Sequence, residues 1–142
     1  NESDIIPVVF AAYFHDSIED ARLTYNDVVS IAGRFMTNEQ CITAAEIVYA
    51  LTNDKGRTRK ERAGEHYYAG IRETPYAPFV KLCDRLANMT YCFNGTNDAN
   101  NHMHKVYASE WSHFLQAITV SKHDSRYSLP ASMVSEVQSL FA

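Results

Sequence analysis

The first hydrophobic segment of the chain is almost unbroken. Residues 5 to 14 read IIPVVFAAYF, and an apolar run of this length is typical of a buried helix. Asp4 is a suitable N-cap residue, and Pro7 is tolerated in a first helical turn. The pattern predicts a buried helix over residues 5–14, with a buried strand as the competing interpretation.

Helical spacing continues through the next forty or so residues of the chain. Thr24 is placed to cap a helix over residues 25–35, and Asn38 is placed to cap a second helix over residues 39–51. Apolar residues recur at helical spacing in the first of these: Val28, Val29, Ala32 and Phe35. Both segments are predicted to be amphipathic helices.

The basic segment NDKGRTRKER, residues 53–62, interrupts this pattern and predicts a loop. Helical spacing resumes after the loop at Tyr67, Tyr68 and Ile71. A longer helix is predicted to follow Pro75 and Pro78 and to end near Asn94-Gly95, with an apolar stripe that consists of Phe79, Leu82, Cys83 and Leu86.

Two further helices complete the predicted fold. One covers residues 102–120 through Trp111 and Phe114, and a short last helix begins at Pro130. The chain contains no convincing period-two strand and no internal repeat. We therefore predict an all-α fold, a single domain over residues 1–142 built as a bundle of about six to eight helices.

Composition narrows the class of protein. The chain has 142 residues, of which 46% are hydrophobic and 21% charged, as in a compact soluble domain. A net charge of −4 argues against polymeric DNA or RNA as a partner, and no apolar run is long enough to predict a membrane span. Three cysteines without a CxxC pair favour a reducing, cytoplasmic location. No sequence feature indicates a homo-oligomer interface, although an oligomer is compatible with the sequence.

A group of ionisable residues follows the first apolar segment directly. The stretch HDSIED places Glu19 four residues after His15 and Asp20 four residues after Asp16, so each pair shares a face if the helix continues. If the helix ends there, His15 and Asp16 can turn toward one ion. Four such groups beside a buried segment are costly to place without a cation. The alternative is a solvated helix end.

A second motif, VKLCDRLANM over residues 80–89, places Asp84 and Asn88 on one helix face. Asp84 lies at the edge of the apolar stripe, from which Lys81 and Arg85 are predicted to point further around the helix. The alternative is an exposed aspartate in an ordinary salt bridge. Histidine and aspartate together suit Mn²⁺, Fe²⁺, Mg²⁺ or Zn²⁺, and such a site favours hydrolysis.

The two motifs together resemble the HD-domain phosphohydrolases, and within them the RelA/SpoT-type alarmone hydrolases, whose patterns are HDxxED and KLADRLxNM. The segments ALTNDKGRTRKER and MHKVYASEWSHF are also similar to small stand-alone members of that family. The resemblance implies that His15, Asp16 and Asp84 are metal ligands and that Asn88 contacts the substrate near its ribose. It also implies that Glu19 and Asp20 orient and activate the attacking water.

The resemblance implies a Mn²⁺-dependent enzyme that removes the 3′-pyrophosphate from the guanine nucleotide (p)ppGpp, giving GDP or GTP and pyrophosphate. Two alternatives stay open. One is an HD-type phosphatase for another nucleotide, such as a deoxynucleotide monophosphate or NADPH, and the other is a nucleotide-binding module without turnover.

The sequence departs from the family pattern at one ligand. The family's first metal-ligand histidine lies well upstream of the HD pair, and no histidine precedes His15 here. We expect either that the natural chain begins further upstream or that the site lacks this ligand. His66, which follows the basic loop, could replace this ligand only if its side chain turned inward, and an exposed helix histidine is the more ordinary interpretation. We expect the remaining histidines not to be ligands: His102, His104, His113 and His123.

The basic residues of the predicted loop allow two interpretations. They either form a solvated loop or grip the phosphates of an anionic nucleotide. The residues concerned are Lys55, Arg57, Arg59, Lys60 and Arg62.

Overall fold

The computed structural model describes residues 1–52, 58–62, 64–95 and 97–141, without the side chains of Glu19, Arg59 and Glu61. Within these ranges the secondary structure is helical and no strand occurs, which confirms the predicted all-α class. The helices are α1 (Glu2–Phe14), α2 (Ser17–Asp20), α3 (Tyr25–Ala32), α4 (Asn38–Leu51), α5 (Arg59–Arg62), α6 (Glu65–Glu73), α7 (Ala77–Asn94), α8 (Asp98–Ile118), the 3₁₀ turn η1 (Ser125–Tyr127) and α9 (Ala131–Ser139).

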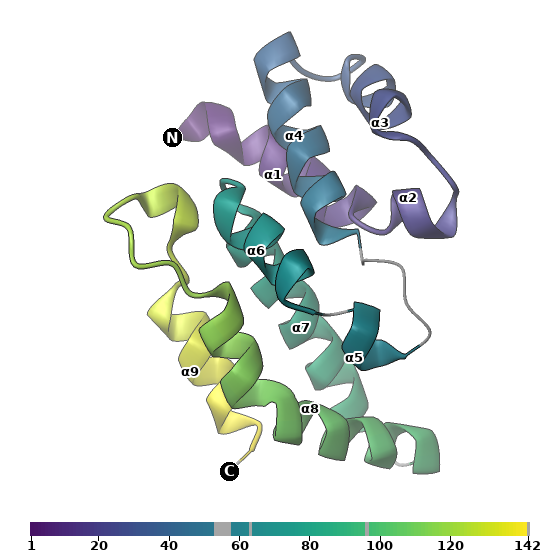
Figure 1. Ribbon diagram of the computed structural model, residues 1–142, viewed down its shortest axis with the longest axis vertical. Helices are drawn as coiled ribbons and strands as arrows, with labels where there is room; N and C mark the ends of the chain where they lie inside the picture. Colours follow the sequence, from purple (N-terminus) through teal and green to yellow (C-terminus); the bar gives the residue numbers. More distant parts are fainter. Residues whose placement is uncertain (53–57, 63, 96, 142) are drawn as a thin grey trace.

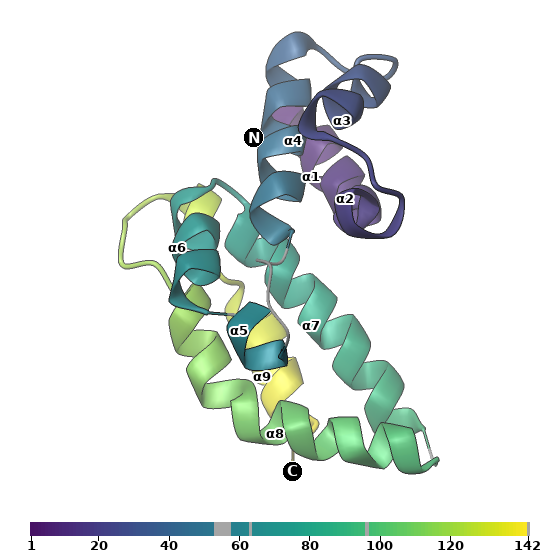
Figure 2. The same cartoon turned by 45° about the vertical axis from the view of Figure 1, so that its right-hand side comes forward.

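The helices form two neighbouring groups that share one hydrophobic core. Helices α1 to α4 gather at the top of Figures 1 and 2, where α4 packs against both α1 and α3. Helices α6 to α9 gather below them, and α7 packs against α8 and α9. Helix α7 also contacts α1 and α4 in the upper group. This places the two predicted motifs, at the end of α1 and within α7, on helices that touch.

Helix α1 begins earlier than predicted. Its N-cap is Asn1 rather than Asp4, so Pro7 lies inside the helix and is buried. Proline has no N–H group, which leaves the carbonyl of Ser3, four residues earlier, without its helical donor. Gln40 of α4 fills this vacancy, because its Nε2 donates to the Ser3 carbonyl at 2.7 Å. A neighbouring helix thus compensates for the internal proline and anchors α1 on α4.

Helices α3 and α4 both begin with a capping box. Thr24 caps α3 together with Asp27, as the sequence predicts, and Thr37 rather than Asn38 caps α4 together with Gln40. Helix α3 ends at Ala32, three residues before the predicted end. Phe35 therefore lies outside the helix and is 68% exposed, so its predicted place on the buried stripe is wrong.

The predicted helices of the second half are present with small changes of boundary. Helix α6 buries Tyr67, Tyr68 and Ile71, and α7 ends at Asn94 before Gly95. Helix α8 begins at Asp98, four residues earlier than predicted, because Asn97 caps it through Asn100. Pro130 is the N-cap of α9. No helix in the described ranges is long and apolar enough to cross a bilayer.

Candidate metal centre

The HDSIED motif forms the junction between α1 and α2. Helix α1 ends at Phe14 and α2 begins at Ser17, so His15 and Asp16 lie between the two helices. Their backbones stay in the right-handed region, with φ −59° and ψ −28° at His15 and φ −91° and ψ 0° at Asp16. This tight junction turns both side chains to the same place: Nε2 of His15 lies 3.2 Å from Oδ2 of Asp16.

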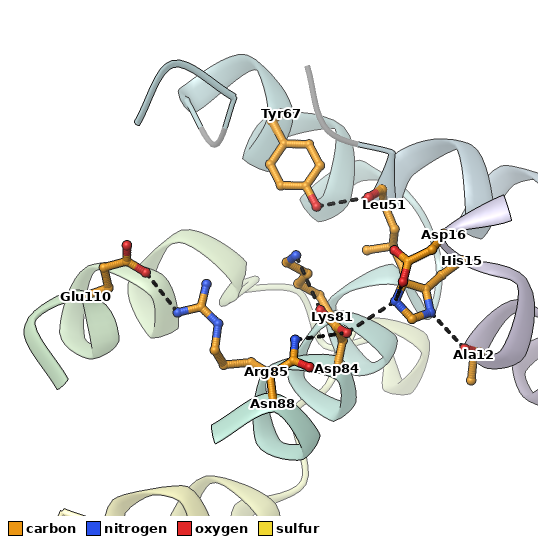
Figure 3. Close-up of polar contacts among 10 residues, drawn as sticks. All are labelled: Ala12, His15, Asp16, Leu51, Tyr67, Lys81, Asp84, Arg85, Asn88 and Glu110. Carbon is orange, nitrogen blue, oxygen red and sulfur yellow. Dashed lines mark hydrogen bonds and ion pairs between the residues drawn. The ribbon is translucent and has the colours of Figure 1, made fainter. Parts of the chain in front are cut away.

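The second motif meets the first at this histidine. Oδ1 of Asp84, in the middle of α7, lies 3.2 Å from the same Nε2 atom of His15. Figure 3 shows the carboxylates of Asp16 and Asp84 beside the same nitrogen of the imidazole ring. Three of the predicted site residues, from two segments almost seventy residues apart, thus converge on one point.

The hydrogen bond at the other ring nitrogen fixes the state of the imidazole. Nδ1 of His15 lies 2.7 Å from the carbonyl oxygen of Ala12. Because a carbonyl only accepts, Nδ1 must carry the hydrogen. In the neutral ring Nε2 therefore bears the lone pair, and it is buried without a hydrogen-bond partner among the described atoms. A lone pair beside two carboxylates is repelled unless a proton or a cation lies between them.

The ionisation of this cluster follows from the charges that lie close together in it. Contact with the Asp84 carboxylate raises the pKa of His15 from 6.5 to about 9, against the lowering effect of burial. Burial would raise the pKa of Asp84, but His15 and the positive charges of Lys81 and Arg85 lower it overall. His15 is therefore an imidazolium at neutral pH, and its positive charge balances the two neighbouring carboxylates.

Two further side chains of α7 surround Asp84. Nζ of Lys81 lies 3.7 Å from Oδ2 of Asp84 and 5.4 Å from the centre of the Tyr67 ring. The prediction that Lys81 points away from Asp84 is wrong, because residues three apart lie on one helix face. Nδ2 of Asn88 donates to Oδ1 of Asp84 at 3.4 Å, so Asn88 and Asp84 share one helix face as predicted (Figure 3).

Arg85 points away from the cluster and holds α7 on α8. Its guanidinium is 3.2 Å from Oε2 of Glu110 and stacks on the ring of Phe114, with 4.0 Å between Cζ and the ring centre. The residue is only 6% exposed. A buried guanidinium paired with a carboxylate and an aromatic ring fixes the rotation of α7 and so the direction in which Asp84 points.

The remaining candidates are not part of the contacts described above. The side chain of Glu19 lies outside the description, so its role stays a prediction, and Asp20 is exposed at the end of α2. His66 is exposed on α6, whereas the rings of His104 and His113 pack against Phe93 and Tyr68. None of these histidines replaces the predicted upstream ligand in the described part of the chain.

The basic segment of the predicted loop is only partly described. Lys55 and Arg57 lie outside the described residues, as does the side chain of Arg59, while Lys60 and Arg62 are exposed. The interpretation of this segment as a phosphate-binding loop stays a prediction.

The donor atoms fit a divalent ion in kind but not in number. One imidazole nitrogen and two carboxylates are ligands that Mn²⁺, Fe²⁺ and Zn²⁺ accept. Two ligand atoms about 2.1 Å from one ion lie about 3.0 to 3.4 Å apart, which agrees with the two separations of 3.2 Å. Yet in the described ranges no group of three or more His, Cys, Asp and Glu side chains is already arranged as an ion site. Further ligands, such as water, would have to complete the coordination.

Sequence reasoning missed two parts of this cluster. The Ala12 carbonyl that orients His15 has no sequence signal, because any residue offers a backbone carbonyl. The Lys81–Asp84 pair had one, namely the spacing of three residues on a helix.

Comparison with known proteins gives one distant similarity to an enzyme. The chain is 31% identical over 84 residues to a zebrafish (Danio rerio) protein described as guanosine-3′,5′-bis(diphosphate) 3′-pyrophosphohydrolase MESH1. The match covers 59% of this chain but only 42% of the relative. No protein-family model matches the chain, and no solved structure matches it. These findings show a distant similarity to this enzyme over less than half of its length.

Proposed function

We propose that this chain is a metal-dependent phosphohydrolase that removes the 3′-pyrophosphate of (p)ppGpp, giving GDP or GTP and pyrophosphate. The observation that carries the proposal is the convergence of Asp16 and Asp84 on one buried atom, Nε2 of His15, at 3.2 Å each. The distant similarity to a zebrafish 3′-pyrophosphohydrolase supports the choice of substrate.

In this proposal His15, Asp16 and Asp84 hold a divalent ion, most simply Mn²⁺. A bound divalent ion activates water and stabilises negative charge on phosphoryl oxygens. The Ala12 carbonyl holds a hydrogen on Nδ1, so Nε2 of His15 is the ring nitrogen that would bind an ion in place of its proton. The 3.7 Å contact between Lys81 and Asp84 adds a positive charge next to the place where anionic phosphates would bind.

The proposal gives the acidic pair of α2 the role of handling the water. Asp20 is exposed, as a residue that exchanges protons with solvent can be, and Glu19 lies one residue closer to the HD pair. As general base, one of them takes the proton of the water whose oxygen bonds to phosphorus. The bond from phosphorus to the ribose 3′ oxygen breaks, and that oxygen gains a proton. Asn88, beside Asp84, is placed to contact the ribose.

A panel of substrates tests this assignment. Pyrophosphate release from ppGpp is measured with Mn²⁺, beside phosphate release from deoxynucleotide monophosphates and from NADPH. We expect pyrophosphate from ppGpp and little phosphate from the others. Turnover of NADPH or of a deoxynucleotide alone would refute the substrate and favour an HD-type phosphatase for another nucleotide. The control is Glu19→Gln, which is expected to bind Mn²⁺ as the wild type does and to turn over slowly.

One observation favours a second candidate function, a nucleotide-binding module without turnover. In the described ranges His15 is the only histidine that contacts the two aspartates, and the donors do not yet form an ion site. Binding of ppGpp without hydrolysis, with or without Mn²⁺, would support this alternative.

A further inference from the structure

Tyr76, at the start of α7, has a backbone conformation that tyrosine rarely adopts. Its φ is 67° and its ψ is −8°, in the left-handed region. For a bulky residue this conformation is a genuine outlier, which persists only when its surroundings determine it. Tyr76 is the N-cap residue of α7, yet its side chain does not cap that helix. The side chain must therefore be held by something else.

The contacts of Tyr76 join three separate elements. Its backbone N–H donates to the carbonyl of Arg126 in η1 at 2.7 Å, and its own carbonyl accepts from the N–H of Val80 in α7 at 3.0 Å. Its hydroxyl donates to Oδ2 of Asp4 in the first turn of α1 through a short hydrogen bond. Burial and Asp4 raise the pKa of the phenol to about 12, so the hydroxyl keeps its proton at neutral pH.

The neighbouring packing shows why this bond matters for the placement of α1. An open pocket of about 470 Å³ lies at the surface between the N-terminal part of α1 and the start of α7, and Ile5, Val8 and Phe79 line it. Ile5 is 58% exposed, so apolar packing constrains the spacing of the two helices less here than in the core. The Tyr76–Asp4 hydrogen bond lies at this pocket, since both residues also line it.

Two polar contacts join helices α1 and α7, in addition to the hydrophobic core that both helices share. Asp4 and His15 lie eleven residues apart on or just after α1, and Tyr76 and Asp84 lie eight residues apart on α7. The Asp4–Tyr76 bond joins the start of α1 to the start of α7, and the His15–Asp84 pair joins the end of α1 to the middle of α7. Because a helix is stiff over this length, about 16 Å in α1, a shift at one end moves the other.

We propose that Tyr76 is a positioning residue, whose hydrogen bond to Asp4 aligns α1 on α7 so that His15 and Asp84 stay within reach of one ion. This inference rests on the proposed metal site. Tyr76 itself does not touch the His15 cluster. Its left-handed backbone aims the ring at α1 while the chain starts α7, which an ordinary N-cap conformation would not do.

The test compares Tyr76→Phe with a matched control, Tyr25→Phe. Each substitution removes one hydroxyl that donates to a carboxylate, because Tyr25 donates to Oε1 of Glu46 at 2.8 Å between α3 and α4. Mn²⁺ affinity of the full chain is measured by isothermal titration calorimetry, well below the melting temperature of each variant. We expect Tyr76→Phe to weaken Mn²⁺ binding by about threefold to tenfold and Tyr25→Phe to leave it unchanged. Equal affinity of Tyr76→Phe and wild type, or an equal loss in both variants, would overturn the proposal.

A crystal structure of Tyr76→Phe without metal separates this proposal from the metal site. We expect the distance between Nε2 of His15 and Oδ1 of Asp84 to exceed the 3.2 Å of the wild type. If the wild type fails to bind Mn²⁺, the proposed metal site is refuted. The distance between His15 and Asp84 in the two crystal structures then tests the positioning role of Tyr76 without the metal. An unchanged distance overturns the positioning role, and Asp4→Asn provides the same comparison if Tyr76→Phe does not fold.

Discussion

Replacing Asp84 with asparagine changes the charge of the cluster while nearly keeping its shape. In the ion-free protein the pKa of His15 is raised to about 9, and contact with Asp84 is the main cause. A folded-state pKa above the unfolded value of 6.5 stabilises the protein below pH 6.5, and this stability is lost as the pH rises through 9. We therefore expect the free energy of unfolding of the wild type to fall between pH 6.5 and 9.

The magnitude follows from the interval between the two pKa values. The full interval corresponds to ~3 kcal/mol. The His15 side chain is 19% exposed, so some solvent screening reduces this, and we expect a loss of roughly 2 kcal/mol across this pH range. Asp84→Asn removes the main cause, so its stability should change little between pH 6.5 and 9. It also removes an anionic ligand, which should weaken Mn²⁺ binding on the order of a hundredfold.

Two assays check this prediction. Urea denaturation without metal, at several pH values, gives the free energy of unfolding, and isothermal titration calorimetry gives the Mn²⁺ affinity. Asp98→Asn is the control, because Asp98 is an exposed aspartate in the first turn of α8. It should keep both the pH dependence and the affinity of the wild type. Wild-type pH dependence or wild-type Mn²⁺ affinity in Asp84→Asn would refute the reasoning.

Three further predictions concern stability. Gln40→Ala loses the bond to the first turn of α1 and half of the capping box of α4, which should cost about 1 to 2 kcal/mol in urea denaturation; an unchanged midpoint would contradict this. Glu110→Gln leaves the buried guanidinium of Arg85 without its carboxylate, and a loss of about 1 to 3 kcal/mol is expected, whereas a neutral effect would argue against that pair. Asp124 is paired with Arg126, which lowers its pKa to about 2. Its contribution is present above pH 4 and is lost as the pH falls through 2, so Asp124→Asn should reduce the acid sensitivity of unfolding, and equal acid curves would count against it.

The helices follow from local sequence rules to within a few residues. Thr24 and its capping box set the start of α3, and Tyr67, Tyr68 and Ile71 are buried on α6 as their spacing predicts. The errors lie where a distant residue intervenes. Pro7 is tolerated inside α1 because Gln40 supplies the missing donor, and no local pattern around Pro7 carries that information.

The candidate centre was predictable as a set of residues but not as a geometry. The motif pair identified His15, Asp16 and Asp84, which do converge on one point. Helical spacing alone could not bring residues from α1 and α7 together, because that contact depends on tertiary packing. No sequence feature predicted the left-handed backbone of Tyr76, because that conformation is usually inferred from a glycine or an asparagine in the sequence.

The central claim is that His15, Asp16 and Asp84 hold one divalent ion. A crystal of the full chain grown with Mn²⁺, measured at a wavelength where manganese scatters anomalously, tests it most directly. We expect one anomalous peak in contact with Nε2 of His15 and with the carboxylates of Asp16 and Asp84, and none in Asp84→Asn. A wild-type map without a peak among these three residues would contradict the claim.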